Sequence, residues 1–372
     1  MQKKDKLILG LIFTRGISLK IWEKVGNLER EIKPYIELAK SINEIYFFTY
    51  GGKYDSGYQN SLPQNIKIIP KPSYIPTFLY VFLMPIIKSQ YFRKIDVIKT
   101  NQMDGSWAGV IAKILFKKKL IIRCGYEWLD FIIQGRRGWL KIQIARVVES
   151  LSYNSADAII ITSEVDKKFI SDTFSVSPSK INVVPNYIDI HHFRSQPIEK
   201  VSGRIIFVGR LEPQKNILAF VESLKGLNVN LVMAGAGSMK REIINTANMD
   251  GISIEFLGNV PQSALPIELA KSEIYVLPSL YEGNPKTLLE AMACGVACVG
   301  SNAKGISNVI HDGETGLLAD PTPAGLREKI KLLLENKDQR DRLGANARQQ
   351  IVREQSLEAI IEKELKIYEQ LL

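Results

Sequence analysis

Two carboxylates eight positions apart, Glu282 and Glu290, mark the part of the sequence best suited to chemistry. Glu282 lies in a loop that contains Pro and Gly, and Glu290 lies in a predicted helix with apolar neighbours. A carboxylate in apolar surroundings must find a hydrogen-bond donor or a cation. The hydroxyl groups of a sugar or a ribose are such donors, and the free N–H groups at a helix start attract phosphate. This segment therefore predicts a site for a nucleotide-sugar.

A strand, a loop and a helix are predicted in succession around these acids. The apolar run 274–277 predicts a buried strand, and a loop follows over 278–283. We expect Asn284 as the N-cap of the helix and Pro285 as its first residue, where no backbone N–H is needed. Gly295 suits the left-handed turn that ends a helix.

Gly209 and Arg210, with Lys215 five residues beyond the arginine, form a second group suited to phosphate chemistry. Departure of a nucleoside diphosphate leaves extra negative charge on oxygen, and preorganised cations stabilise that charge. An arginine grips two oxygens at once, whereas a lysine acts as a point charge. The alternative is that both cations are solvated charges near the start of a helix.

Together these segments resemble the signature of the retaining glycosyltransferase family 4, whose members have the GT-B architecture of two facing Rossmann-like domains. The sequence EGNPKTLLEAMACG, from Glu282 to Gly295, matches the family pattern E-G-x-P followed by L-L-E-A-M-A-x-G. The segment from Gly209 to Lys215 matches the family's G-R-L-x-x-x-K, although Asn216 stands where the family usually has Gly. The alternative interpretation is a core helix with one exposed and one salt-bridged glutamate.

The resemblance implies a role for each of these residues. Arg210 and Lys215 are expected to bind the donor diphosphate and Glu282 the transferred sugar, and these three are the expected catalytic residues. Glu290 is expected on the ribose hydroxyls, and backbone amides near Thr287 on the diphosphate. The full set expected to contact the substrate, besides the catalytic residues, is Gly16, Gly209, Gly283, Asn284, Pro285, Lys286, Thr287, Leu288 and Glu290.

Metal ions and cofactors are not expected. The resemblance implies a reaction that retains the anomeric configuration without a metal ion, with Arg210 and Lys215 in the metal's place. The D-x-D metal motif of the other major glycosyltransferase architecture is missing from the sequence. Cys124, Cys294 and Cys298 do not have the spacing of a zinc site, and their odd number favours reduced thiols in the cytosol.

Short apolar segments alternate with helical or irregular stretches along the whole chain, which predicts an α/β protein with parallel sheets. The expected strands span residues 6–13, 44–49, 66–69, 96–99, 119–122, 158–162, 181–184, 204–208, 229–234, 252–257, 274–277 and 296–299. In open parallel sheets, ligands bind beyond the carboxyl ends of the strands. Glycines and polar residues follow each of the last five strands, so we expect a ligand-binding edge there.

The length of 372 residues predicts two domains. We expect a Rossmann-like acceptor-side domain over residues 1–190 and a linker over 191–203. A Rossmann-like nucleotide-sugar-binding domain is expected over 204–355. The resemblance implies that the final helix, over about 356–372, packs back on the first domain.

The acceptor side of the site is less well defined. Gly16 lies in a loop after the first strand that resembles the family's glycine-bearing loop near donor and acceptor. Arg123 and Glu127 flank the position at which many family members carry a histidine, which is absent here. Both are expected to line the acceptor cleft, and the sequence assigns neither a catalytic role.

The positive charge of the chain is concentrated in residues 1–190, which hold 28 Lys/Arg and 17 Asp/Glu. A basic domain can meet nucleic acid, anionic lipid or a phosphate-bearing substrate. The aromatic stacking signatures of RNA-binding modules are missing, so nucleic acid is not expected as a partner. The apolar run 78–87 is too short to span a bilayer. It predicts either a core helix or a face that docks on anionic lipid.

We expect a hexosyltransferase that moves a sugar from a nucleotide-sugar donor to a hydroxyl of a glycan or lipid-linked acceptor, in cell-surface polysaccharide biosynthesis. The segment 7–13 is too short for a secretion signal, so a cytoplasmic location is expected. Within the cytoplasm, the inner face of the cell membrane is the expected site, given the basic and partly apolar first half. Two alternatives stay open. One is a nucleotide-sugar epimerase on the same scaffold, and the other is a non-catalytic, membrane-associated partner subunit.

Overall fold

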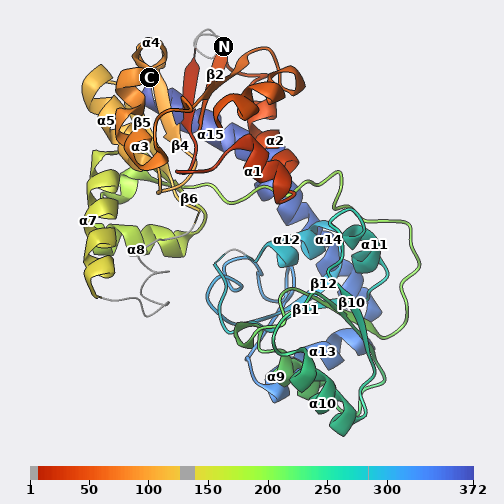
Figure 1. Ribbon diagram of the computed structural model, residues 1–372. Helices are drawn as coiled ribbons and strands as arrows, with labels where there is room; N and C mark the ends of the chain where they lie inside the picture. Colours follow the sequence, from red (N-terminus) through yellow and green to blue (C-terminus); the bar gives the residue numbers. More distant parts are fainter. Residues whose placement is uncertain (1–6, 126–138, 284) are drawn as a thin grey trace. The chain divides into compact units, whose positions relative to one another are not determined.

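The computed structural model describes residues 7–125, 139–283 and 285–372 (Figure 1). The chain divides into two compact units. The first contains Met1–Pro185 together with Ile360–Leu372, and the second contains Asn186–Ala359. Each unit has its own parallel sheet with helices between the strands, so the expected α/β class with two Rossmann-like domains is confirmed. No helix in the described ranges is long and apolar enough to cross a membrane.

The first unit is built on a seven-stranded sheet of order β3-β2-β1-β4-β5-β6-β7, and every neighbouring pair is parallel. The strands consist mainly of Ile, Leu, Val and Phe and are buried on both faces, as parallel strands between helix layers must be. Their bounds are β1 (Ile8–Ile12), β2 (Glu44–Thr49), β3 (Ile66–Pro70), β4 (Val97–Thr100), β5 (Lys119–Arg123), β6 (Ala158–Ile161) and β7 (Ile181–Val183).

Helices connect these strands. Their bounds are α1 (Leu19–Lys24), α2 (Leu28–Leu38), η2 (Gly52–Ser61), α3 (Thr77–Ile87), α4 (Ser89–Phe92), α5 (Ser106–Phe116), α7 (Trp139–Ser155), α8 (Glu164–Phe174) and η3 (Pro178–Lys180). The last helix of the chain, α15 (Leu357–Leu371), contributes most of its length to this unit.

A buried ion pair joins α15 to the central strand β4. The Nζ atom of Lys99 lies 2.7 Å from both carboxylate oxygens of Glu364, and the Tyr368 hydroxyl donates to the same carboxylate at 2.7 Å. The two side chains are only 2% and 9% exposed. Burial lowers the pKa of Lys99. Burial alone would raise the pKa of Glu364, but the charge of Lys99 and the hydrogen bonds hold it below its ordinary value.

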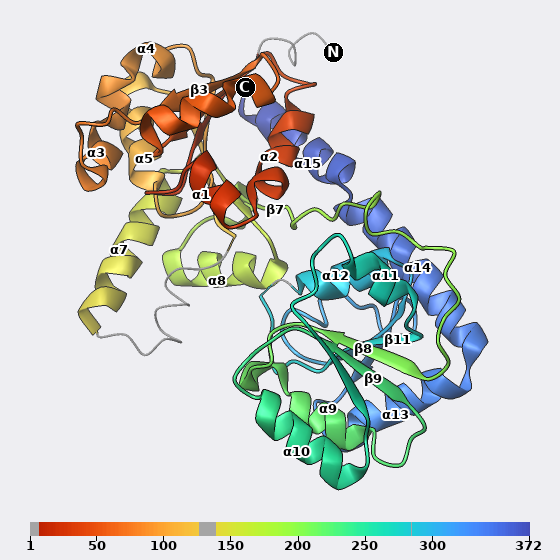
Figure 2. The ribbon, with the colours of Figure 1, turned by 45° about the vertical axis from the view of Figure 1, so that its right-hand side comes forward.

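The second unit has a six-stranded sheet of order β10-β9-β8-β11-β12-β13, also parallel throughout. The strands are β8 (Arg204–Val208), β9 (Asn230–Ala234), β10 (Ile254–Gly258), β11 (Ile274–Leu277), β12 (Ala297–Ser301) and β13 (Leu317–Ala319). The helices are η4 (Pro213–Lys215), α9 (Ile217–Ser223), α10 (Lys240–Asp250), α11 (Leu265–Ala270), α12 (Lys286–Ala293), α13 (Pro323–Glu335) and α14 (Lys337–Gln355). Figure 2 shows α9, α10 and α13 on one face of this sheet and α11, α12 and α14 on the other.

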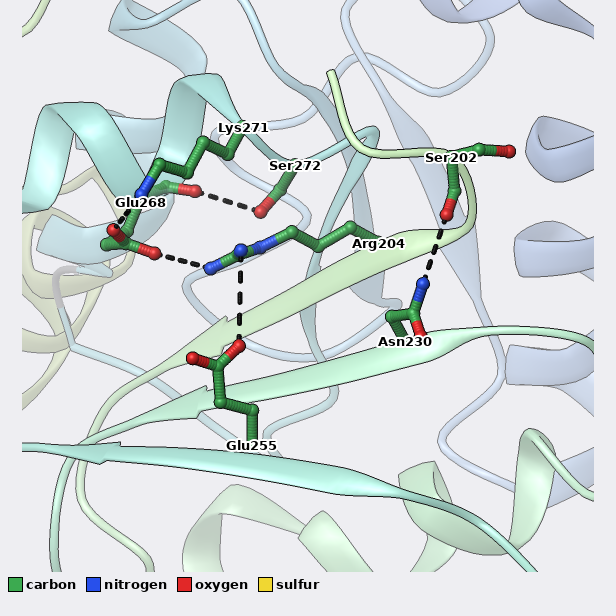
Figure 3. A network of polar contacts seen from close by, with 7 residues as sticks. All are labelled: Ser202, Arg204, Asn230, Glu255, Glu268, Lys271 and Ser272. Atoms are coloured by element: carbon green, nitrogen blue, oxygen red, sulfur yellow. Dashed lines mark hydrogen bonds and ion pairs between the residues drawn. The ribbon is translucent and has the colours of Figure 1, made fainter. Parts of the chain in front are cut away.

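Polar contacts close the amino-terminal end of this second sheet (Figure 3). Arg204, at the start of β8, forms an ion pair with Glu268 of α11 and lies 4.0 Å from Glu255 of β10. Lys271 reaches the same Glu268 carboxylate at 2.8 Å. These contacts hold α11 against the strands at the amino-terminal end of the sheet, so we interpret them as structural. The carboxyl edge, at the opposite end, is not involved in them.

We predict that Lys99→Met destabilises the first unit by about 3–5 kcal/mol, because it leaves the Glu364 charge buried without its cation. Adding Glu364→Leu in the same chain should recover at least half of this loss. Urea unfolding followed by tryptophan fluorescence measures the effect, since all four tryptophans lie between residues 22 and 139, within this unit.

The matched control is Lys366→Met, which removes an exposed ion pair with Glu362 on the same helix. It should change the free energy of unfolding by at most about 1 kcal/mol. A loss no larger for Lys99→Met than for Lys366→Met would contradict the role assigned to the buried pair.

Candidate active site

The loops that follow β8 and β9 lie directly against each other at the carboxyl edge of the second sheet. The Gly209 N–H donates to the Ala234 carbonyl at 2.9 Å, and the Leu211 N–H donates to the Ala236 carbonyl at 2.9 Å. A Cβ atom on Gly235 would lie 1.9 Å from the carbonyl oxygen of Gly209. Any side chain at Gly235 would force the two loops apart. The glycines therefore allow the backbones of the two loops to touch next to Arg210.

Arg210 and Lys215 both lie on the segment that follows β8. The Arg210 side chain is exposed and lies near the charge of Glu212. Lys215 ends the short helix η4, and its side chain is largely buried. The next residue, Asn216, has the left-handed conformation, with φ 52° and ψ 36°, and its amide donates to the Pro321 carbonyl at 2.9 Å. Asparagine tolerates this conformation better than most residues, which explains how it can replace the family's usual glycine.

The carboxylate of Glu282 is held by two side chains. The Nζ atom of Lys215 lies 2.5 Å from its Oε1 atom, and the Ser279 hydroxyl donates to the same oxygen at 2.6 Å. The Glu282 N–H donates to the Lys304 carbonyl at 2.8 Å. Gly305 has φ +87°, and a Cβ atom there would lie 2.1 Å from the Glu282 carbonyl oxygen. The loop after β12 therefore fixes the backbone that carries this acid.

Helix α12 begins one residue later than expected. Its first residue is Lys286, and Pro285, with φ −77° and ψ 70°, lies outside the helix. The Pro285 carbonyl accepts the N–H groups of Leu288 and Leu289 at 3.0 and 3.2 Å, so Pro285 itself occupies the cap position. The expectation that Pro285 is the first helical residue is wrong by this one position. Asn284, the expected N-cap, lies outside the described residues.

Thr287 anchors the start of α12 beside the end of β8. Its hydroxyl donates to the Val208 carbonyl at 3.1 Å and lies 2.8 Å from the Tyr275 hydroxyl. Burial raises the pKa of Tyr275 well above its ordinary value, so its hydroxyl keeps its proton at neutral pH. The first N–H groups of an α-helix are not used by the helix's own hydrogen bonds, and in α12 the N–H group of Thr287 is one of them. The bond from the Thr287 hydroxyl to Val208 brings this end of α12 to the residue before Gly209.

Glu290 is buried on α12, as its apolar neighbours predicted, and it has polar partners. Gln262 Nε2 donates to its Oε1 atom at 3.1 Å, and Lys286 Nζ lies 3.7 Å from the same oxygen. The sequence did not single out Gln262. It lies in the loop after β10, so the rule that ligand-binding residues follow the carboxyl ends of strands could have found it.

The remaining expected residues differ in their surroundings. Gly283 is exposed beside Glu282, whereas the Leu288 side chain is fully buried in the core. Gly16 belongs to the first unit, in the loop after β1, with φ +79°. Arg123 ends β5, and its guanidinium donates to the Asn101 carbonyl at 3.3 Å. Glu127 lies outside the described residues.

Within the described ranges, no three or more His, Cys, Asp or Glu side chains lie close enough to hold a metal ion. The three cysteines are buried. Burial raises the pKa of the Cys294 thiol to about 12, so this thiol is protonated at neutral pH.

Two family models match the chain, one after the other. Residues 190–350 match the glycosyl transferases group 1, and residues 36–192 match glycosyltransferase family 4. A fold with two parallel Rossmann-like sheets and these matches define a glycosyltransferase of the GT-B architecture. The chain belongs to the group 1 glycosyltransferases, and the resemblance drawn from its motifs is confirmed at that level.

Characterised relatives agree with this assignment. The chain is 29% identical over 250 residues to the GalNAc-alpha-(1->4)-GalNAc-alpha-(1->3)-diNAcBac-PP-undecaprenol alpha-1,4-N-acetyl-D-galactosaminyltransferase of Campylobacter jejuni, covering 65% of this chain and 66% of that protein. It is 28% identical over 246 residues to the UDP-Gal:alpha-D-GlcNAc-diphosphoundecaprenol alpha-1,3-galactosyltransferase of Escherichia coli, covering 61% and 63%. The matched part thus spans somewhat less than two thirds of each relative.

Solved structures show the same fold. Anabaena HepE in complex with UDP superposes with a TM-score of 0.73 and 16% sequence identity, covering 98% of this chain and all of that one. At this identity the likeness establishes the fold.

We predict that Gly305→Ala disturbs the backbone beneath Glu282. Gly251→Ala is the matched control, because Gly251 also has a positive φ, of 67°, but has no atom within 4 Å of an added Cβ. Gly305→Ala should therefore cost about 1–3 kcal/mol more, the typical cost of overpacking. Hydrogen exchange of peptides from β11 and β12 measures the difference in this unit alone, and equal protection in the two variants would refute the predicted clash.

Proposed function

We propose that this enzyme transfers a hexose from a nucleotide-sugar to a hydroxyl of a glycan or lipid-linked acceptor, with retention of configuration and without a metal ion. The observation that supports this most is the contact between Lys215 and Glu282, which brings a cation and an acid from two different loops to one point. In a nucleotide-sugar the diphosphate and the sugar are joined at the anomeric carbon. Groups that hold these two parts must therefore be neighbours, as Lys215 and Glu282 are.

The diphosphate is proposed to lie between the Arg210 and Lys215 side chains and the start of α12. Arg210 is exposed, so it is accessible to an anion. In this proposal, the N–H group of Thr287 and the helix dipole at the start of α12 add positive potential beside the diphosphate. This arrangement would stabilise the charge that develops on the leaving diphosphate. It would supply what a metal ion supplies in other glycosyltransferases, namely charge neutralisation of the leaving group.

The sugar and the ribose are proposed to be held by the two acids. Lys215 and Ser279 both contact the Oε1 atom of Glu282. A carboxylate has about four lone-pair sites on its two oxygens, so Glu282 can also accept a hydrogen bond from a sugar hydroxyl. When a diphosphate enters, the Lys215 ammonium can share its three donors between phosphate and Glu282. Glu290, with Gln262 at its side, is proposed to accept hydrogen bonds from the ribose hydroxyls.

Uracil is the base to test first, and a lipid-linked saccharide is the acceptor to test first. HepE was crystallised with UDP, and the name of the Escherichia coli relative specifies UDP-Gal. Both relatives named above act on saccharides attached to undecaprenol through phosphate groups. With such an acceptor, the proposed reaction would take place at the cytoplasmic face of the cell membrane, in the biosynthesis of cell-surface polysaccharide. Gly16 and Arg123 of the first unit are proposed on the acceptor side.

We predict that Arg210→Ala, Lys215→Ala and Glu282→Ala each lower transfer by about 100- to 1000-fold, the usual cost of removing one preorganised charge-stabilising group. A thermal-shift screen of nucleotide-sugars first identifies the donor, since a selective ligand raises the melting temperature. Release of nucleoside diphosphate in the presence of acceptor then measures the rate. Arg241→Ala, which removes an exposed arginine from α10, is the control and should retain wild-type activity.

Wild-type rates in the double variant Arg210→Ala plus Lys215→Ala would refute the proposed leaving-group role. Incubating the donor alone separates transfer from epimerisation, because an epimerase would convert the sugar without an acceptor. Activity that disappears on addition of a chelator would contradict the proposed metal independence.

A further inference from the structure

Helix α3 exposes an apolar face. The sequence left open whether residues 78–87 form a core helix or a face that docks on anionic lipid, and in the structure one side of the helix is buried and the other is exposed. Tyr80, Val81 and Met84 are buried against the first unit. The exposed side chains on the other side are Phe78, Leu79, Phe82, Leu83, Ile86 and Ile87, with Phe78 62% and Ile86 58% exposed. Exposure of so many neighbouring large apolar side chains marks an interaction site.

Helix α5 extends this apolar face. Figures 1 and 2 show α3 and α5 side by side, and the ring of Phe82 lies 6.2 Å from the ring of Trp107 at the start of α5. Near the end of α5, Ile114 and Leu115 are exposed, Ile114 to 71%. We call the exposed apolar residues of these two helices the α3–α5 surface.

The segment that carries the α3–α5 surface is strongly basic. Apart from the buried Lys99, residues 71–123 hold nine Lys/Arg and only two Asp/Glu. One of the two acids, Asp104, is paired with Arg15, 3.0 Å away. Lys117 and Lys119 are exposed directly after the exposed end of α5. The surface thus combines apolar side chains with neighbouring positive charge.

We propose that the α3–α5 surface docks on an anionic lipid bilayer, with its apolar side chains in the interfacial region and its lysines at the headgroups. An apolar helix face with basic residues beside it binds membranes through buried apolar area and attraction to anionic lipid. A second copy of this chain fits less well. A two-fold symmetric contact would bring the same basic segment of both copies together, and like charges repel.

The inference deepens the proposed function and rests on it in one respect, since a membrane-docked first unit would meet a lipid-linked acceptor at the bilayer. The residues of the surface lie in the first unit, and the proposed donor site lies in the second. Substitutions on the surface therefore test membrane docking without touching the donor site.

The apolar part of the proposal is tested with the full chain and vesicles of phosphatidylcholine and phosphatidylglycerol in equal parts, by co-sedimentation. The wild-type protein should pellet with these vesicles at low salt. Phe78→Gln plus Ile86→Gln should weaken binding roughly tenfold or more, because two large apolar side chains no longer leave water. The matched control, Ile244→Gln plus Met249→Gln, changes two exposed apolar residues of α10 and should bind as the wild type does.

The charge part is tested by Lys117→Gln plus Lys119→Gln, which should weaken binding roughly tenfold or more, given the usual contribution of each basic residue near an anionic surface. The control pair, Lys225→Gln plus Lys331→Gln, removes the same charge from the second unit and should leave binding unchanged. Phosphatidylcholine vesicles alone, or high salt, should bind the wild type more weakly.

Absence of pelleting with anionic vesicles at low salt would overturn the proposal. So would a dimer, or a complex with another protein, that Phe78→Gln plus Ile86→Gln dissociates while vesicle binding is unchanged. Melting temperatures with and without UDP, measured without vesicles, keep the two proposals apart. A surface variant that loses vesicle binding but keeps the UDP shift supports docking alone, whereas vesicle binding with no shift by any nucleotide-sugar counts only against the proposed transfer.

Discussion

The contact between Lys215 and Glu282 is the constraint on which the rest of the carboxyl edge depends. A cation that follows β8 and an acid that follows β11 meet at 2.5 Å, and Ser279 shares the same carboxylate oxygen. Neither side chain could keep this position alone, because a largely buried charge needs a partner of opposite sign. The backbone beneath them is fixed as well, since the Gly305 loop lies against Glu282 and leaves no room for a side chain.

The parallel sheet explains why residues so far apart in sequence meet at this edge. All six strands of the second unit end on the same side, so the loops that follow them converge. Thr287 ties the start of α12 to the end of β8, and Gln262 brings the loop after β10 to Glu290. At the other end of the sheet, the ion pairs of Arg204 tie α11 to the strands (Figure 3). At the amino-terminal end of the sheet the charged side chains pair with one another. At the carboxyl edge, cations, acids and the start of helix α12 lie close together.

The sequence predicted much of this fold because apolar strand segments and turn residues are local signals. All twelve expected strands are present, each within two residues of its expected bounds. The short strand β13 was missed. The start of α12 was misplaced by one residue, because a proline suits both the cap and the first turn. Gln262 was missed although it follows β10, where the rule for strand ends applies, whereas the side of α3 that is exposed depends on tertiary packing, which no local pattern records.

A crystal structure of the protein with UDP bound would show directly whether Lys215 and Glu282 mark the donor site. We expect the diphosphate beside Arg210 and Lys215, in front of the start of α12, with the ribose hydroxyls at Glu290. A diphosphate bound elsewhere on the second unit, with the contact between Lys215 and Glu282 unchanged and Arg210 pointing away from the diphosphate, would contradict the roles proposed for these residues.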